Sequence, residues 1–190
     1  MTAPLILGFD TSAAYCAAAL VRGDSVLASV GEEMARGQAE RLMGLLEDVL
    51  ASQGVVWADL DALAVGTGPG NFTGIRIGVS AARGLALGLG CPAYGVTGFE
   101  ARDRLARDGT RVAIPAPREM VYVMDGAQVV LTHAADVRDA ARPPPPAALA
   151  EAIARHAVSL WPQKAPAPAP FYVRAPDAAP ARDAPPPILP

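Results

Sequence analysis

The chain has 190 residues, of which 52% are hydrophobic and 18% charged, and its formal net charge is −3. This length and apolar content suit one or two compact domains with a sizeable core, and the negative charge argues against a protein that binds nucleic acid through a basic surface alone. The chain has two cysteines, Cys16 and Cys91, and no secretory pattern at the N-terminus, which predicts a cytoplasmic chain with free thiols and without a membrane segment. It has two histidines, so neither metal nor histidine chemistry is expected.

Three predicted strands open the chain. The apolar run at residues 5–9 ends at Asp10-Thr11-Ser12, where small polar side chains favour a turn, so a buried strand is predicted. Residues 16–21 and 25–30 are β-compatible and flank Arg22-Gly23-Asp24, which is typical of a hairpin turn. Between residues 38 and 53 apolar side chains recur every three or four positions, and this spacing predicts an amphipathic helix that Gly54 ends.

Strands and helices then alternate. A strand at residues 60–65 leads through a glycine-rich loop into a second helix at 73–89, which is rich in alanine and glycine. Pro92 cannot continue that helix, and a strand at 93–96 and a helix at 99–107 follow. The order β-β-β-α-β-α predicts the α/β class, with two related halves of which the second is reduced.

The second half contains shorter elements and most of the prolines. Strands are predicted at 112–114, 120–124 and 128–132, with a turn at Asp125-Gly126. Five of the 19 prolines lie in residues 1–142 and fourteen in 143–190; Pro143 to Pro146 predict a stiff extended spacer before a helix that carries Leu149, Ile153 and Leu160. We therefore predict a first half at 1–108, a reduced second half with proline-rich spacers at 109–176, and a disordered tail at 177–190.

The loop from Gly66 to Arg76 is the most informative motif. Glycines between a strand and a helix N-terminus expose N–H groups that hold phosphates in many proteins, and they equally serve as a structural turn that sets helix packing. The Walker A and dinucleotide fingerprints do not match, which favours the structural turn but leaves both interpretations open. Under the phosphate interpretation, weak nucleotide contacts would come from Asp10, Thr11, Ser12, Gly68 and Gly70.

Three segments carry a resemblance to a known family. Residues 6–12, the start of the first helix at 38–42, and above all Gly-Thr-Gly-Pro-Gly-Asn-Phe-Thr-Gly-Ile-Arg-Ile-Gly at 66–78 resemble the bacterial TsaB family. The resemblance is strong over residues 5–99 and weaker at 118–122 and 170–174. It implies the ASKHA fold, the actin-like and sugar-kinase-like architecture of two ribonuclease-H-like halves, which agrees with the element order.

The resemblance also implies a function. TsaB proteins are non-catalytic subunits that bind the catalytic homologue TsaD directly and the ATPase TsaE through the complex, which attaches threonylcarbamoyl to the adenosine beside the anticodon of tRNAs reading codons that begin with A. TsaD holds a metal through histidines on the helix that corresponds to residues 38–53. This chain has Gln38 and Gly44 there and no histidine, so no catalytic residue and no metal are expected, with ATP or ADP only at the level of the complex.

Partner binding in this family uses the first two helices, which implies an interface here. The leucine-bearing helix and the small-residue helix would supply it, and the implied residues are Leu42, Leu45, Leu46, Val49, Gly78, Ala81 and Ala82. About half of these apolar positions are expected to cover the chain's own sheet instead. The same face would suit a homodimer when the chain is free, and the sequence leaves homodimer and monomer open. The tRNA is expected to meet the complex with little direct contact to this subunit.

Two enzyme classes remain as alternatives. An ATP-dependent small-molecule kinase of the ASKHA fold would use Asp10, Thr11 and the glycine loop, although lysine is nearly absent from the chain. A metalloprotease is opposed by the two histidines, His133 and His156, which lie far apart in the sequence without other ligands near them.

Overall fold

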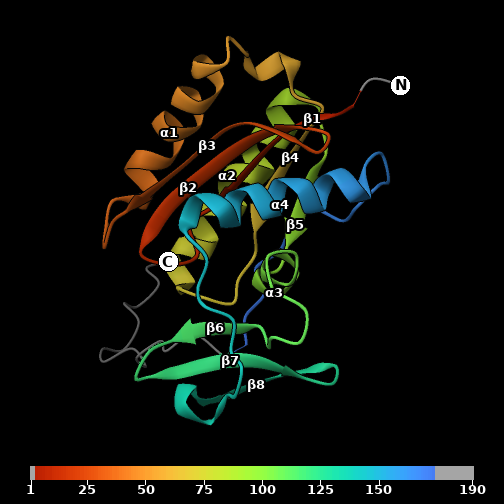
Figure 1. The fold of residues 1–190 in the computed structure, drawn as a ribbon. Helices are drawn as coiled ribbons and strands as arrows, with labels where there is room; N and C mark the ends of the chain where they lie inside the picture. The colour runs from red at the N-terminus through yellow and green to blue at the C-terminus, as the bar shows by residue number, and fades with distance from the viewer. Residues whose placement is uncertain (1–2, 174–190) are drawn as a thin grey trace, which may run out of the picture.

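Five strands from the first half form one mixed sheet, with the order β3-β2-β1-β4-β5 (Figure 1). The structure is a computed structural model, and it describes residues 3–173. The strands are β1 (Leu5–Asp10), β2 (Tyr15–Arg22), β3 (Ser25–Glu33), β4 (Ala62–Gly66) and β5 (Ala93–Val96). The first three are antiparallel neighbours, whereas β4 pairs parallel to both β1 and β5. All five predicted strands are confirmed, and Gly23 turns the predicted hairpin with a φ of +55°.

Two helices cover one face of this sheet. Helices α1 (Gln38–Ser52) and α2 (Phe72–Leu89) pack their apolar side chains onto the odd-numbered residues of β1, Leu5, Leu7 and Phe9. The predicted helices at 38–53 and 73–89 are therefore confirmed to within one residue at each end. Asn71 caps α2, because its side-chain Oδ1 accepts a hydrogen bond of 2.9 Å from the backbone N–H of Gly74.

The opposite face is covered by α3 (Gly98–Asp103) and α4 (Pro146–Leu160), and α4 lies across the strands (Figure 1). Helix α4 approaches the sheet closely because its inner face is mostly alanine and because glycine stands beneath it. A Cβ on Gly8 would lie 2.7 Å from the Cβ of Ala154, and one on Gly31 would lie 2.7 Å from the backbone nitrogen of Ala147. Helix α4 follows the small sheet in the chain, yet it packs on the first sheet.

The proline run is shorter than predicted. Pro146 is the first residue of α4 rather than the last residue of an extended spacer. A proline has no N–H to lose at the first helical position, and its fixed φ suits the helix. The helix predicted at 99–107 likewise ends early, at Asp103, because none of residues 104–107 is buried and Leu105 is exposed.

The second sheet is small and antiparallel. It contains β6 (Ala113–Ala116), β7 (Met120–Asp125) and β8 (Gln128–His133) in that order, and Gly126 turns the β7–β8 hairpin as predicted. Single 3-10 turns at Trp57–Asp59 and Ala134–Asp136 were not predicted. Across residues 3–173 the helices fall short of the length and apolarity that a membrane span requires. The tail predicted at 177–190 lies outside the described residues, and the division at 108 and 109 stays a prediction.

Candidate functional site

The candidate site lies at the carboxyl ends of β1 and β4, two parallel neighbours inside the large sheet. Phe9 pairs with Val65 in this parallel ladder, so the turn Asp10-Thr11-Ser12 lies beside the loop that begins at Gly66. The loop and the turn are 54 or more residues apart in sequence, and strand pairing brings them together.

Asp10 is held by the chain's own donors. Its carboxylate accepts hydrogen bonds from the backbone N–H of Ser12 (3.0 Å), the Ser12 hydroxyl (2.9 Å) and the Tyr15 hydroxyl (2.5 Å). The residue is only 1% exposed, and three donors satisfy most of the acceptor capacity of a carboxylate. Asp10 therefore organises the turn that the small polar residues predicted. The hydrogen bond from Tyr15 was not predicted.

The glycines of the loop allow backbone to meet backbone. A Cβ on Gly70 would collide with the carbonyl oxygen of Ser12, and one on Gly74 with that of Thr11. The Thr11 hydroxyl donates to the Gly74 carbonyl at 2.7 Å, and the N–H of Asn71 donates to the Ser12 carbonyl at 2.6 Å. The glycine pattern is thus explained by close packing between loop and turn, which supports the structural interpretation of the motif.

The predicted nucleotide-contact residues lie together at these strand ends. Asp10, Thr11, Ser12 and Gly68 are buried, and Gly70 is exposed. Gly68 has a φ of +100°, and a Cβ on it would lie 2.6 Å from Ile75 Cδ1. Nucleotide contact from these residues stays a prediction, and the four buried ones are already in contact with the chain itself.

A segment near the end of the described chain covers the outer side of the loop. The N–H of Phe171 donates to the Thr67 carbonyl at 2.8 Å, and Arg76 Nε donates to the Tyr172 hydroxyl at 3.0 Å. The Arg76 guanidinium lies 3.8 Å from the ring centre of Phe72, whose ring is 4.7 Å from that of Tyr172. The resemblance at 170–174 marked this segment, but its contact with the loop was not predicted; Arg174 lies outside the described residues.

The residues of the implied partner interface are mostly interior. Leu42, Leu45, Leu46 and Val49 pack in the core between α1 and the sheet, and on α2 Gly78 and Ala82 are buried while Ala81 is half-buried. The apolar stripe of α1 is therefore occupied by the chain's own sheet. Their contact with a partner stays a prediction, and a partner that docks on this conformation meets the exposed residues between them.

Exposed positions alternate with these buried ones on both helices. Leu87 is 86% exposed and Met43 39% exposed, and nothing lies within 4 Å of a Cβ built on Gly84 or Gly88. Ser80, Gly84, Leu87 and Gly88 follow the i, i+4, i+7, i+8 spacing of one helix face. We call these four residues and Met43 the α1/α2 outer face.

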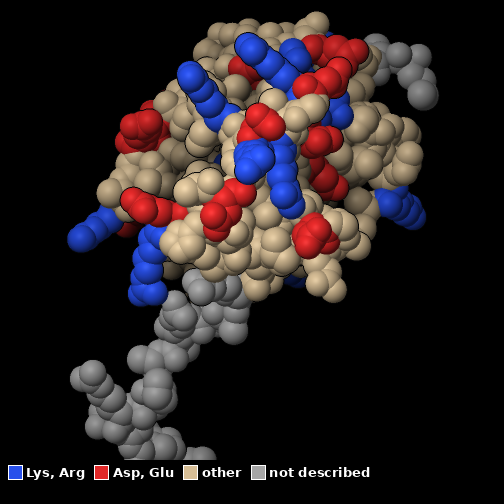
Figure 2. Space-filling model, turned by 60° about the horizontal axis from the view of Figure 1, so that its bottom comes forward, with Lys and Arg blue, Asp and Glu red and all other residues tan. Residues whose placement is uncertain are grey.

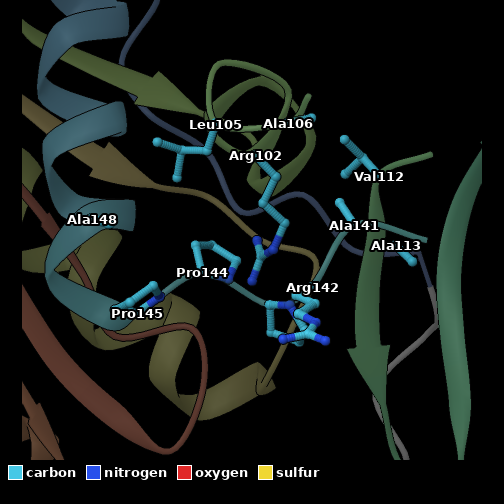
Figure 3. A pocket seen from close by; sticks show the side chains of 11 residues that line it. Arg102, Leu105, Ala106, Val112, Ala113, Ala141, Arg142, Pro144, Pro145 and Ala148 are labelled. Carbon is cyan, nitrogen blue, oxygen red and sulfur yellow. The ribbon is translucent and has the colours of Figure 1, made fainter. Parts of the chain in front are cut away.

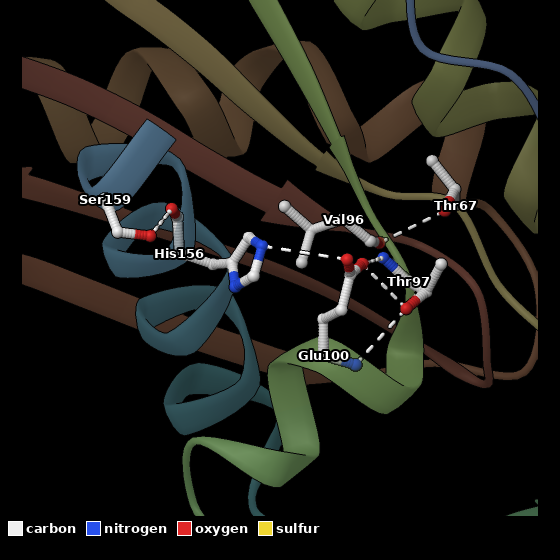
Figure 4. Close-up of polar contacts among 6 residues, drawn as sticks. All are labelled: Thr67, Val96, Thr97, Glu100, His156 and Ser159. Carbon is white, nitrogen blue, oxygen red and sulfur yellow. Dashed lines mark hydrogen bonds and ion pairs between the residues drawn. The ribbon is translucent and has the colours of Figure 1, made fainter. Parts of the chain in front are cut away.

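His156 lies on α4 near Glu100 of α3 (Figure 4). Its Nε2 is 3.8 Å from a Glu100 oxygen, while the other Glu100 oxygen accepts from the Thr97 N–H (2.7 Å) and hydroxyl (2.8 Å) in a capping box. The Ser159 hydroxyl donates to the backbone carbonyl of His156 and not to the imidazole. These contacts fix helix ends. Within residues 3–173, no three histidine, cysteine, aspartate or glutamate side chains come together as a metal-binding group.

Burial controls the acidity of the thiol and phenol on β2. Burial raises the pKa of Cys16 to about 11, and it raises the pKa of Tyr15 well above its usual value, with a further contribution from the Asp10 charge. Both groups hold their protons to higher pH in the folded chain than in the unfolded chain. Their contribution to stability is complete below about pH 9 and is lost as pH rises through the folded-state values.

We therefore expect the free energy of unfolding to fall above about pH 9. Urea unfolding at pH 8, 9.5 and 10.5 measures this slope, and the double variant Tyr15→Phe/Cys16→Ala is expected to flatten it, although it starts from a lower stability at pH 8 because the bond to Asp10 is lost. An unchanged alkaline slope in the double variant would contradict the assignment.

Comparison with known proteins agrees with this geometry. The family model described as "TsaD: tRNA N6-adenosine threonylcarbamoyltransferase" matches residues 29–158. The chain is 41% identical over 92 residues to the tRNA threonylcarbamoyladenosine biosynthesis protein TsaB of Escherichia coli, a match that covers 48% of this chain and 39% of that protein. The chain thus spans about two fifths of the length of this relative.

Two further relatives cover more of the chain. An uncharacterized protein of Mycobacterium tuberculosis is 34% identical over 200 residues, which cover 92% of this chain and 94% of that protein. The solved structure of YeaZ from Pseudomonas aeruginosa superposes with a TM-score of 0.56 at 33% identity, covering 68% of this chain and 64% of that one.

The mixed sheet with helices on both faces and the glycine loop at the end of β4 define an ASKHA-type, ribonuclease-H-like α/β protein with a TsaD-like domain. Its sequence relatives and solved neighbours narrow this class further. The chain belongs to the TsaB/YeaZ family.

Proposed function

We propose that the chain is a non-catalytic subunit of the machinery that forms threonylcarbamoyladenosine in tRNA, and that it acts by binding TsaD directly and TsaE through the complex. Membership of the TsaB/YeaZ family is the observation that carries this proposal. The internal bonding of Asp10 supports a non-catalytic role, because its carboxylate is engaged by Ser12 and Tyr15. The proposal places the chain in the cytoplasm.

The α1/α2 outer face is the proposed docking surface for TsaD. Small residues at Ser80, Gly84 and Gly88 let a partner helix approach closely, because the distance between packed helices depends on the side chains at the contact. Leu87 supplies an apolar side chain that is otherwise left in water. In the free chain the same face is proposed to form a homodimer, since a self-complementary patch suits two-fold pairing.

The tRNA is proposed to contact mainly the other subunits. Arginine and acidic side chains are interspersed over the end of the molecule that carries the small sheet (Figure 2), and the net charge is −3. Phosphate-backbone binding requires clustered positive charge, so an interspersed surface supports an indirect role.

Leu87→Asp tests the proposal. Wild-type chain mixed with TsaD is expected to co-purify, and with TsaE present to support threonylcarbamoyl transfer to tRNA. Leu87→Asp is expected to weaken TsaD binding about tenfold or more, because it puts a charge into an apolar contact, as truncation of a central interface residue does. Light scattering gives the complex mass and the homodimer mass.

Met124→Asp is the matched control, because Met124 is also an exposed apolar residue (40%) but lies on β7 of the small sheet. Failure of the wild-type chain to bind TsaD would refute the proposed function. Full binding by Leu87→Asp would refute only the proposed surface.

A further inference from the structure

A pocket lies between the end of α3, the start of β6 and the proline run that leads into α4 (Figure 3). Its volume is about 320 Å³. It lies on the side of the molecule opposite α1, and none of its lining residues belongs to the glycine loop or to the α1/α2 outer face. The proposed docking of TsaD does not use it.

Arg102 lines this pocket, and one of its guanidinium nitrogens has no partner among residues 3–173. Its Nη1 donates to the Gly98 carbonyl at 3.2 Å, but its Nε is buried and has no hydrogen-bond partner within the part of the chain that the structure describes. A buried donor without a partner loses its hydration and gains no bond in return. The Nε edge of a guanidinium is one of those that bind oxyanions through two parallel bonds.

A second arginine reaches the same pocket from the other side. Figure 3 shows Arg102 extending from α3 toward Pro144 and Arg142, which precede α4. A neighbouring hollow of about 530 Å³ shares Arg142 and adds Arg107. Neither hollow has a carboxylate in its lining, and among residues 3–173 no ion pair involves any of these three arginines.

Two arginines line this pocket, a third lines the neighbouring hollow, and no carboxylate among the described residues lines either, which favours a ligand with more than one negative charge. A phosphate monoester carries about two charges near neutral pH, and arginine recognises its oxygens bidentately. The remaining walls are apolar and rigid, with Leu105, Val112 and Pro144. An apolar wall beside a cationic end suits an organic group attached to the phosphate, and the volume is in the range of small-molecule sites.

We propose that this pocket binds a small organic phosphate, with Arg102 and Arg142 holding the phosphate oxygens and with Leu105, Val112 and Pro144 packed against the organic group. The site does not depend on the proposed binding of TsaD.

Phenyl phosphate is a suitable probe, because it joins a phosphate to an apolar ring. Calorimetric titration of the full chain at low salt is expected to show one binding site, with affinity that falls as salt rises. Arg142→Gln and Arg102→Gln are each expected to raise the Kd about tenfold or more, as loss of a charge-assisted hydrogen bond does. Arg142→Lys keeps the positive charge but cannot make two parallel hydrogen bonds to a phosphate, so its Kd is expected to lie between those of the wild type and Arg142→Gln.

Arg83→Gln is the control, because Arg83 is an exposed arginine on α2 and lines neither hollow. Arg142 is exposed as well, so Arg142→Gln tests the site even where Arg102→Gln lowers stability. Absence of binding by phenyl phosphate, or an unchanged Kd in Arg142→Gln, would overturn the proposal. Equal affinity for inorganic phosphate would overturn the part that concerns the organic group.

Discussion

Gly8→Val is expected to unfold the chain or to detach α4 from the sheet. Gly8 lies in the middle of β1, and a Cβ there would meet Ala154 Cβ at 2.7 Å, Ala154 N at 2.8 Å and Ala150 O at 2.9 Å. Two of these three atoms belong to helix backbone, which cannot move aside as a side chain can. Overpacking of a core costs about 1–3 kcal/mol, and valine adds two further methyl groups, so a loss of roughly 3 kcal/mol or more is expected.

Urea unfolding followed by circular dichroism measures this loss. The free energy of unfolding of Gly8→Ala is expected to lie between those of the wild type and Gly8→Val, because alanine adds only the first clashing atom. Gly84→Ala is the matched control: nothing lies within 4 Å of its Cβ, so helix propensity alone should stabilise the chain by about 1 kcal/mol. Wild-type stability in Gly8→Ala would show that α4 does not pack on β1 as described.

Asp10→Ala is expected to have the second-largest effect. The substitution removes the acceptor of three hydrogen bonds and leaves the Ser12 and Tyr15 donors in a buried turn. A buried donor without a partner costs about 1–3 kcal/mol, and bonds to a charged acceptor are at the upper end. The expected loss is therefore roughly 3 kcal/mol or more, with a smaller loss in Asp10→Asn, which keeps the shape.

Two readouts separate structure from chemistry at Asp10. Asp48→Ala is the control, because Asp48 is an exposed carboxylate whose pair with Arg41 lies at the surface and is expected to contribute little to stability. Asp10→Asn that still folds is expected to bind TsaD as wild type does. The contradicting result would be magnesium-dependent ATP hydrolysis by the isolated wild-type chain that is lost in Asp10→Asn while stability is unchanged. That result would give Asp10 a chemical role in addition to its structural one.

Local pattern was enough to predict most of the elements. The spacing of Leu42, Leu45, Leu46 and Val49 predicted α1, because the periodicity of an amphipathic helix is visible within the helical segment itself. The same spacing did not say which surface covers the stripe. The answer depends on β1, β2 and β4, which lie elsewhere in the sequence, and the structure gives the stripe to the chain's own sheet.

The candidate site was predicted as two separate motifs. The turn at Asp10 and the loop at Gly66 were each visible, but their mutual contact follows from the parallel pairing of β1 with β4. The role of Tyr15 could not be predicted, because an aromatic residue next to an apolar strand is common and does not by itself indicate a hydrogen bond to a carboxylate. Arg102 carried none either, since only the fold places it opposite Arg142.

The position of α4 also sets the order in which the protein can be completed during synthesis. The last strand of the large sheet ends at Val96, but the helix that covers one of its faces spans Pro146–Leu160. A ribosome adds about 5–20 residues per second. The face of β1 and β2 that α4 covers is therefore synthesised several seconds before α4 is. During that interval the nascent chain exposes this apolar face of the sheet, so the core beneath α4 is the last part of the large sheet to be closed.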